Sequence, residues 1–156
     1  MNSKTLRSLS LGAIALSRQF GVRITVEQLE KKISQGQIKS EKELKNTLKE
    51  QGVKVQRLKP SLKTLIDRSY YFPCVALMRD GSARILISCK PNAKNIVEFQ
   101  SIDPLDPTSK VNVENEVEFR RNWVGSVYLI SSETGIASQD RIFDWTWFIP
   151  ELYRFK

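Results

Sequence analysis

Residues Tyr71 to Cys89 read Y-F-P-C-V-A-L-M-R-D-G-S-A-R-I-L-I-S-C, two apolar and partly β-branched runs joined at Arg79-Asp80-Gly81. Asp-Gly between such runs is one of the strongest short-range signals for a β-hairpin, because glycine accepts a positive φ without a steric penalty. We therefore predict a central β-hairpin with its turn at these three residues. Most of the helical signal precedes this hairpin, and most of the strand signal follows it.

Apolar spacing and capping residues divide the chain into helices followed by strands. This order is typical of an α+β domain with an antiparallel sheet. The predicted elements are a helix that ends at Gly21, a short helix opened by the capping box of Thr25 and Gln28, a helix over 41–51 opened by a second capping box of Ser40 and Glu43, a strand over 53–58, a short helix after Pro60, the hairpin, a strand over 96–99, a short helix over 116–123, and a strand over 127–130 preceded by Gly125.

The first twenty residues allow two interpretations. Lys4 and Arg7 followed by L-S-L-G-A-I-A-L resemble a short signal peptide. The same residues also fit a helix, because apolar side chains recur at spacings of three and four. We favour the helix, with a core-facing stripe of Leu6, Leu9, Ala13, Leu16 and Phe20.

The composition is that of one globular domain: 156 residues, 40% hydrophobic and 27% charged. There are 25 Lys and Arg against 17 Asp and Glu, a formal net charge of +8. This charge favours an anionic partner, such as nucleic acid, anionic lipid headgroups or an acidic polypeptide, although it also fits a merely solvated surface. The sequence has no Gly-rich phosphate loop, and we predict neither a nucleotide nor a nucleic acid as partner.

Histidine is absent from the sequence, which removes the side chain best suited to proton transfer at neutral pH and the commonest metal ligand. A Ser-His or Cys-His hydrolase is therefore excluded by composition. The two cysteines, Cys74 and Cys89, lie in predicted strands among apolar residues, without a C-x-x-C motif. We predict buried, reduced thiols rather than a disulfide, and we predict no metal or other cofactor.

The C-terminal end differs in composition from the predicted domain, which spans 1–131. Residues 132–142 are mostly polar and fit a linker. Residues 143–156 hold six aromatic side chains in fourteen residues, too short a segment to cross a bilayer as a helix. This segment either packs on its own domain or lies at a membrane interface, where aromatic and basic side chains are both favoured. The membrane-proximal candidates are Trp145, Trp147, Phe148, Tyr153 and Arg154.

Together these features resemble the N-terminal peptidase-like domain of haemolysin B-type ATP-binding-cassette exporters of type I secretion systems. That domain is similar to the cysteine peptidases that remove double-glycine leaders. The most specific likeness is F-D-W-T-W-F-I-P at 143–150, which looks like the family's junction with the first transmembrane segment. The Asp80-Gly81 hairpin, Ile102-Asp103-Pro104 and Trp123-x-Gly125 add weaker support. The resemblance implies a papain-like cysteine peptidase fold for this α+β domain, with transmembrane helices and an ATPase expected after Lys156.

The active peptidases of this family use a cysteine at the start of the first helix, a histidine just after the hairpin turn and an aspartate before a proline. By the resemblance, Ser8 stands at the cysteine position, Ala83 at the histidine position and Asp103 at the aspartate position, while the oxyanion-donor glutamine falls near Asn2. A serine hydroxyl with no base beside it is a poor nucleophile. We therefore predict a pseudoenzyme in which Asp103 serves the structure. Residual proteolysis would appear as leader cleavage that is lost when Ser8 is replaced.

Degenerate domains of this family are understood to bind the unfolded export substrate, which in some exporters is an acidic, glycine-rich calcium-binding repeat protein. The net charge of +8 supports this independently, because a basic surface attracts an acidic chain with an affinity that falls as salt rises. We predict this function at the cytoplasmic face of the bacterial inner membrane, for a domain that is monomeric when alone. The alternative is a docking module that packs on the exporter's own nucleotide-binding or membrane domain, or on the anionic membrane surface.

Three side chains are candidates for contact with the substrate: Leu77 and Arg84 on the hairpin, and Trp123 at the end of the last predicted helix. Each also has a plainer explanation. Leu77 fits a core position, because alternate residues of a central strand face inward. Trp123 could fill the gap between its helix and the sheet, and Arg84 could be an exposed edge residue.

Overall fold

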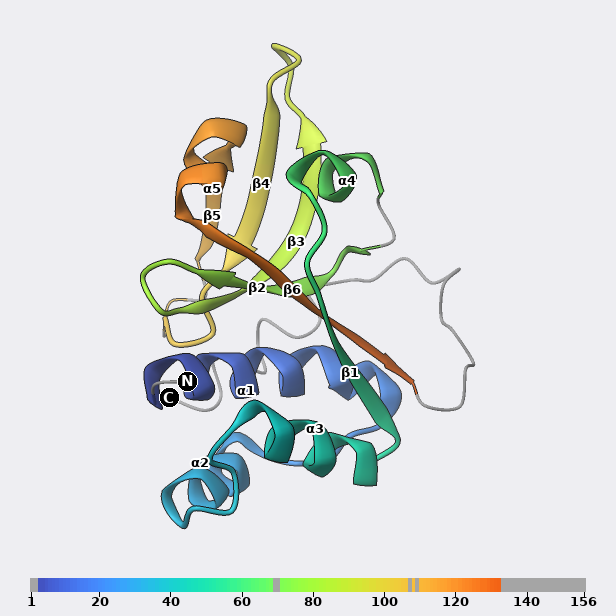
Figure 1. The fold of residues 1–156 in the computed structure, drawn as a ribbon, viewed down its shortest axis with the longest axis vertical. Coiled ribbons are helices and arrows are strands. Elements are labelled where there is room, and N and C mark those ends of the chain that lie inside the picture. Colours follow the sequence, from blue (N-terminus) through green and yellow to red (C-terminus); the bar gives the residue numbers. More distant parts are fainter. Residues whose placement is uncertain (1–2, 69–70, 107, 109, 133–156) are drawn as a thin grey trace.

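The computed structural model describes residues 3–68, 71–106, 108 and 110–132. They form a mixed α+β domain in which helices cover both faces of a six-stranded antiparallel sheet (Figure 1). The predicted fold class is therefore confirmed. The elements in chain order are α1 (Ser3–Ser17), the 3₁₀ turn η1 (Arg18–Phe20), α2 (Val26–Ser34), α3 (Glu41–Glu50), β1 (Val53–Leu58), α4 (Leu62–Asp67), β2 (Cys74–Met78), β3 (Ala83–Pro91), β4 (Val97–Ile102), β5 (Val111–Asn115), α5 (Glu116–Asn122) and β6 (Trp123–Ser132).

The predicted hairpin is confirmed as β2 and β3, which pair from Cys74↔Leu86 to Leu77↔Ala83. Its turn is closed by two backbone hydrogen bonds, from the Met78 amide to the Ser82 carbonyl at 2.8 Å and from the Gly81 amide to the Met78 carbonyl at 3.1 Å. Gly81 has a φ of +89°, the left-handed conformation for which glycine was expected here. The strand order β1-β6-β2-β3-β4-β5 places the hairpin in the middle of the sheet and leaves β1 and β5 at its edges.

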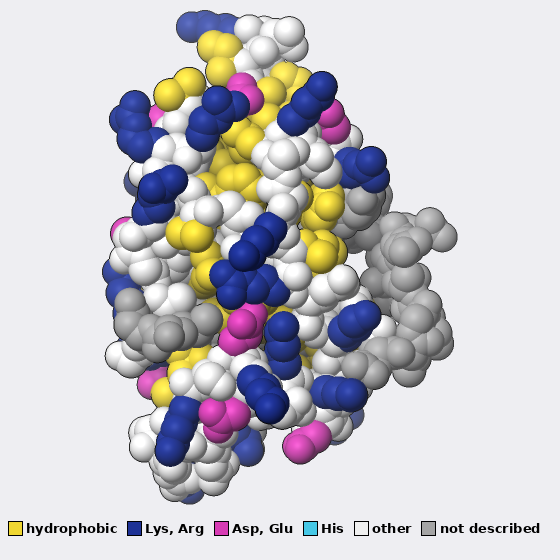
Figure 2. Space-filling view, viewed as in Figure 1, with side chains coloured by type: hydrophobic (Ala, Val, Ile, Leu, Met, Phe, Trp, Pro, Cys, Tyr) yellow, Lys and Arg dark blue, Asp and Glu magenta, His cyan; other side chains and the backbone are white. Residues whose placement is uncertain are grey.

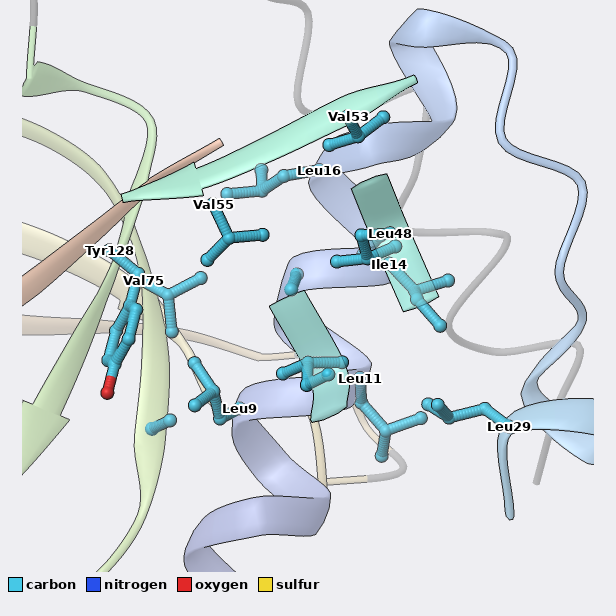
Figure 3. Close-up of a cluster of buried hydrophobic side chains, with 14 of the residues drawn as sticks. Leu9, Leu11, Ile14, Leu16, Leu29, Leu48, Val53, Val55, Val75 and Tyr128 are labelled. Carbon is cyan, nitrogen blue, oxygen red and sulfur yellow. The ribbon is translucent and has the colours of Figure 1, made fainter. Parts of the chain in front are cut away.

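Helix α1 lies across one face of the sheet and forms the centre of the first core cluster, together with α2, α3 and residues of β1, β2, β3 and β6 (Figures 1 and 3). Every residue from Ser8 to Ser17 is buried, so the helix is covered on all sides rather than along the single stripe that the sequence predicted. Of that stripe only Phe20 remains half-buried. Gly21 ends the segment as predicted, with a φ of +87°. Figure 3 shows Leu9, Ile14 and Leu16 of α1 among side chains of α3, β1 and β6.

A second core cluster lies on the opposite face, beneath α4 and α5. The alternation of β2 divides its side chains between the clusters: Val75 and Leu77 belong to the first, and Cys74, Ala76 and Met78 to the second. Because both faces are covered, all five residues of β2 are buried. Three aromatic rings stack in the second cluster, with centroids 4.0 Å apart for Phe99 and Phe119 and 5.4 Å apart for Phe119 and Trp123.

The structure corrects three local predictions. Ser40 precedes α3, but its hydroxyl contacts the Glu43 carboxylate at 3.2 Å instead of capping the helix backbone, so the second capping box is wrong. The first capping box, Thr25 with Gln28, is confirmed. Strand β5 was not predicted, and β6 begins at Trp123, four residues before the predicted strand.

In the described part of the chain, no helix combines the length and the apolar character needed to cross a membrane.

Candidate functional site

The N-terminal half of α1 is joined to the β2–β3 turn by three side-chain contacts. The Thr5 hydroxyl donates to the Gly81 carbonyl at 2.6 Å, and Lys4 Nζ lies 3.4 Å from the Asp80 carbonyl. The Ser8 hydroxyl accepts a hydrogen bond from the Ala83 amide at 2.8 Å and lies 3.2 Å from the Thr5 carbonyl, to which it can donate. Two positions that are 75 residues apart in the sequence, and that the resemblance predicted to share a site, are therefore in direct contact.

This contact is closed to solvent. Ser8 and Ala83 both have a relative exposure of 0%, and Ser82 between Ala83 and the turn has 1%. The Ser8 hydroxyl accepts a hydrogen bond from the Ala83 amide and donates one to the Thr5 carbonyl of its own helix. A nucleophile must reach a substrate carbonyl and must have a base to take its proton. In this geometry Ser8 connects a helix to a strand, and both of its hydrogen bonds within the described residues are to backbone groups.

The Asp80 carboxylate stabilises the turn that carries these contacts. Its Oδ1 accepts hydrogen bonds from the Ser82 amide at 2.8 Å and from the Ser82 hydroxyl at 2.6 Å. Partial burial acts to raise the pKa of Asp80, but the two bonds from Ser82 and the nearby Arg84 and Lys4 outweigh it, so the pKa lies below its usual value. The ionised carboxylate thus favours the folded turn.

Asp103 directly follows the last residue of β4. The β3–β4 ladder ends with the pair Ile85 and Ile102, two residues after Ala83 in β3. A Cβ added to Gly12 of α1 would lie 3.5 Å from Pro104 Cγ and 3.4 Å from Val75 Cγ2, which are ordinary van der Waals distances, so α1 packs against β2 and the loop after β4 here. Asp103 Oδ1 accepts from the Leu105 amide at 3.0 Å, the loop-stabilising role that the sequence analysis favoured.

Comparison with known proteins identifies the family. A sequence model described as the Peptidase C39 family matches residues 9–135. The chain belongs to this family. A comparison with curated proteins finds no match for this C39 domain.

Three solved structures share the fold of this C39 domain. The N-terminal peptidase C39-like domain of the toxin secretion ATP-binding protein from Vibrio parahaemolyticus has 16% identity and a TM-score of 0.55, over 85% of this chain and 98% of that one. The peptidase domain of Streptococcus ComA, a bifunctional ABC transporter of a quorum-sensing pathway, has 16% identity and a TM-score of 0.61, over 85% and 94%. A double-glycine-motif protease of an AMS/PCAT transporter, in complex with the leader peptide, has 14% identity and a TM-score of 0.62, over 83% and 87%.

The three side chains predicted to contact the substrate make contacts within the C39 domain. Leu77 is 8% exposed and belongs to the first core cluster. Trp123 is 6% exposed, stacks on Phe119, and donates its indole N–H to the Ser126 carbonyl at 3.0 Å. Arg84 lies 3.0 Å from Glu114 on β5 and 3.6 Å from Asp80. Their contact with a substrate stays a prediction. The positions of Leu77 and Trp123 favour the structural roles that were weighed against it, but the alternative for Arg84, an exposed edge residue, is wrong, because Arg84 is half-buried in the inner strand β3.

A polar cluster that the sequence analysis missed lies between α3, β1 and β6. Arg57 Cζ lies 5.8 Å from the centre of the Tyr128 ring, its Nη1 lies 3.7 Å from Glu41, and its Nη2 lies 3.3 Å from the Ser126 hydroxyl. Burial, and then the Glu41 carboxylate, raise the pKa of Tyr128. Arg57 and Tyr128 are cross-strand partners, but Glu41 is 16 residues away along the chain, so only tertiary structure brings it to the cluster.

Both cysteines are free thiols, as predicted, although only Cys74 is fully buried and Cys89 is half-buried. Within the described ranges, no three Cys, Asp or Glu side chains converge as metal ligands would. Asn2 and the five membrane-proximal candidates lie outside the described residues.

Proposed function

We propose that this C39 domain is a non-catalytic receptor that binds the unfolded substrate of a type I secretion ABC transporter at the cytoplasmic face of the bacterial inner membrane. The single observation that carries the non-catalytic part is the buried Ser8–Ala83 contact in a chain without histidine. The proton of an attacking hydroxyl would have no acceptor of suitable pKa beside it.

Binding of an acidic, unfolded chain is supported by charge. The chain has a net charge of +8, and a surface of this sign increases the rate at which a polyanion arrives and lowers its dissociation constant at low salt. The solved structures that share the fold are domains of transporters, and one of them is a complex with a leader peptide, so peptide binding is compatible with this fold. We therefore propose that this domain binds a peptide without cleaving it.

Two assays on the full chain test the two halves of this proposal. A peptide with a double-glycine leader, incubated with the wild type and with Ser8→Cys, should stay intact in mass spectra, because neither protein has an imidazole to activate the nucleophile. Cleavage by the wild type that disappears in Ser8→Ala would refute the non-catalytic part.

The binding half is tested by fluorescence anisotropy with a labelled acidic calcium-binding repeat protein. The protein is kept unfolded by omitting calcium and is folded by adding it. We expect binding of the unfolded form only, with a dissociation constant that rises with salt. If neither form of the repeat protein binds, and the isolated nucleotide-binding domain of the exporter binds the C39 domain, the C39 domain is a docking module instead.

A further inference from the structure

Strand β1 is an edge of the sheet whose surroundings are basic. β1 pairs with β6 along Val53–Leu58, and within the described residues no strand pairs with its other edge. Val53 and Val55 are buried against the first core cluster, so the strand is held in place before any partner arrives. An incoming strand would therefore find preordered backbone donors and acceptors, and only the incoming chain would lose conformational entropy.

The cations around this edge come from two neighbouring elements, β1 with the turn after it, and α3. Lys45 and Arg57 lie on either side of Glu41, each 3.7 Å from one of its carboxylate oxygens, which places α3 and β1 cations on one continuous surface. Lys49 of α3, Lys54 of β1 and Lys59 directly after β1 are exposed. We call these five cations the β1 basic edge: Lys45, Lys49, Lys54, Arg57 and Lys59. On the face of the molecule where β1 is unobscured, Lys and Arg side chains plainly outnumber Asp and Glu (Figure 2).

The opposite edge of the sheet has different chemistry. Strand β5 carries Glu114 and no cation, whereas Lys110 precedes it, and α5 after it holds Glu116 and Glu118 in its first turn and Arg120 and Arg121 in its last. Glu114 is already paired with Arg84 at 3.0 Å and with the Asn122 amide at 2.8 Å. The charges around β5 largely cancel, whereas β1 itself carries Lys54 and Arg57 and no acidic residue. An acidic strand would therefore be attracted more strongly to the β1 edge than to the β5 edge.

We propose that the β1 basic edge captures an extended acidic segment of the unfolded secretion substrate by strand addition. This inference rests on the proposed function and names its surface and binding mode. Strand addition accounts for a preference for unfolded protein, because a folded substrate has already paired the backbone groups that β1 requires. Lysines at a sheet edge also prevent two copies of a protein from pairing, and here the same charges that repel a second copy attract an acidic strand.

The test uses two ten-residue acidic peptides of equal charge and the full isotope-labelled chain. One peptide alternates Thr or Val with Asp or Glu, and the other has proline at three alternate positions, which removes amide donors that strand pairing needs. The first peptide should shift the amide signals of Val53–Leu58 and protect them from hydrogen exchange. The proline peptide should bind more weakly by on the order of tenfold or more.

A pair of double variants separates local from overall charge. Lys54→Glu with Lys59→Glu should weaken binding of the first peptide by about tenfold. Lys31→Glu with Lys94→Glu makes the same change in net charge at exposed positions in α2 and in the β3–β4 turn, and should leave binding within about twofold. Equal losses in both double variants, or equal binding of both peptides, would show electrostatic attraction without strand pairing and overturn the inference.

The outcome also separates this inference from the proposed function. If the unfolded acidic protein binds but its shifts map to β5 or to the turn beside Ser8, the receptor function stands and the β1 edge is wrong. If neither the protein nor the peptides bind, both proposals fail.

Discussion

Replacing Ser8 by alanine tests whether the degenerate site has become a structural contact. The variant leaves the Ala83 amide buried without its acceptor, since Ser8 Oγ is the partner at 2.8 Å and both residues are fully buried. An unsatisfied buried amide costs about 1–3 kcal/mol. In a domain of this size the thermal midpoint should fall by roughly 4 °C for each kcal/mol.

Ser34→Ala is the matched control for this experiment. Ser34 also contacts the carbonyl three residues earlier in its helix, that of Lys31 at 3.0 Å, but it is exposed, and among the described residues no other element donates a bond to it. Its replacement should change the free energy of unfolding by less than about 0.5 kcal/mol. Urea unfolding followed by circular dichroism measures both variants. If Ser8→Ala is no less stable than Ser34→Ala, the hydroxyl does not hold α1 to the hairpin, and our explanation of the site is refuted.

Three further predictions concern the core, the turn and the thiols. Leu48→Ala should destabilise the fold by about 2–5 kcal/mol in urea unfolding, because Leu48 is 0% exposed in the first core cluster; a loss below about 1 kcal/mol would contradict the packing. Asp80→Asn should lower the free energy of unfolding at neutral pH, and progressively less below about pH 4. A carboxyl whose pKa is lowered on folding stabilises the fold above its unfolded pKa and loses this effect as pH falls through its folded pKa. A pH-independent difference would show that the charge of Asp80 does not stabilise the turn. Burial raises the pKa of Cys74, and burial followed by the charge of Glu116 raises the pKa of Cys89 to about 11. Iodoacetamide at pH 8 should therefore modify neither thiol rapidly in the native state. Fast labelling of Cys74 in the native state would contradict its burial.

Local sequence signals predicted the parts of the fold that local geometry determines. The Asp80-Gly81 turn requires a positive φ, and the Thr25–Gln28 capping box needs only residues three apart, so both could be predicted from the sequence. Strand β5 was missed because V-N-V-E-N carries few apolar residues, as is usual for an edge strand with one solvated side. Ser40 fits the capping pattern, but the rotamer that decides its partner has no sequence signal.

The candidate site shows a similar division. Positions 8 and 83, which the resemblance assigned to one site, touch in the structure. Burial of Leu77 and Trp123 was one of two alternatives that the sequence allowed, and it is decided by how α1 and α5 cover the two faces of the sheet. The cluster of Arg57, Glu41 and Tyr128 is equally invisible, because its members come from three elements.

The receptor function is tested most directly by an NMR titration of the isotope-labelled chain with one acidic secretion substrate. The substrate is added once unfolded and once folded, at low and at moderate salt. We predict chemical-shift changes with the unfolded form only, and weaker ones at moderate salt. The absence of shifts with either form, or equal shifts with both, would contradict a receptor for unfolded substrate.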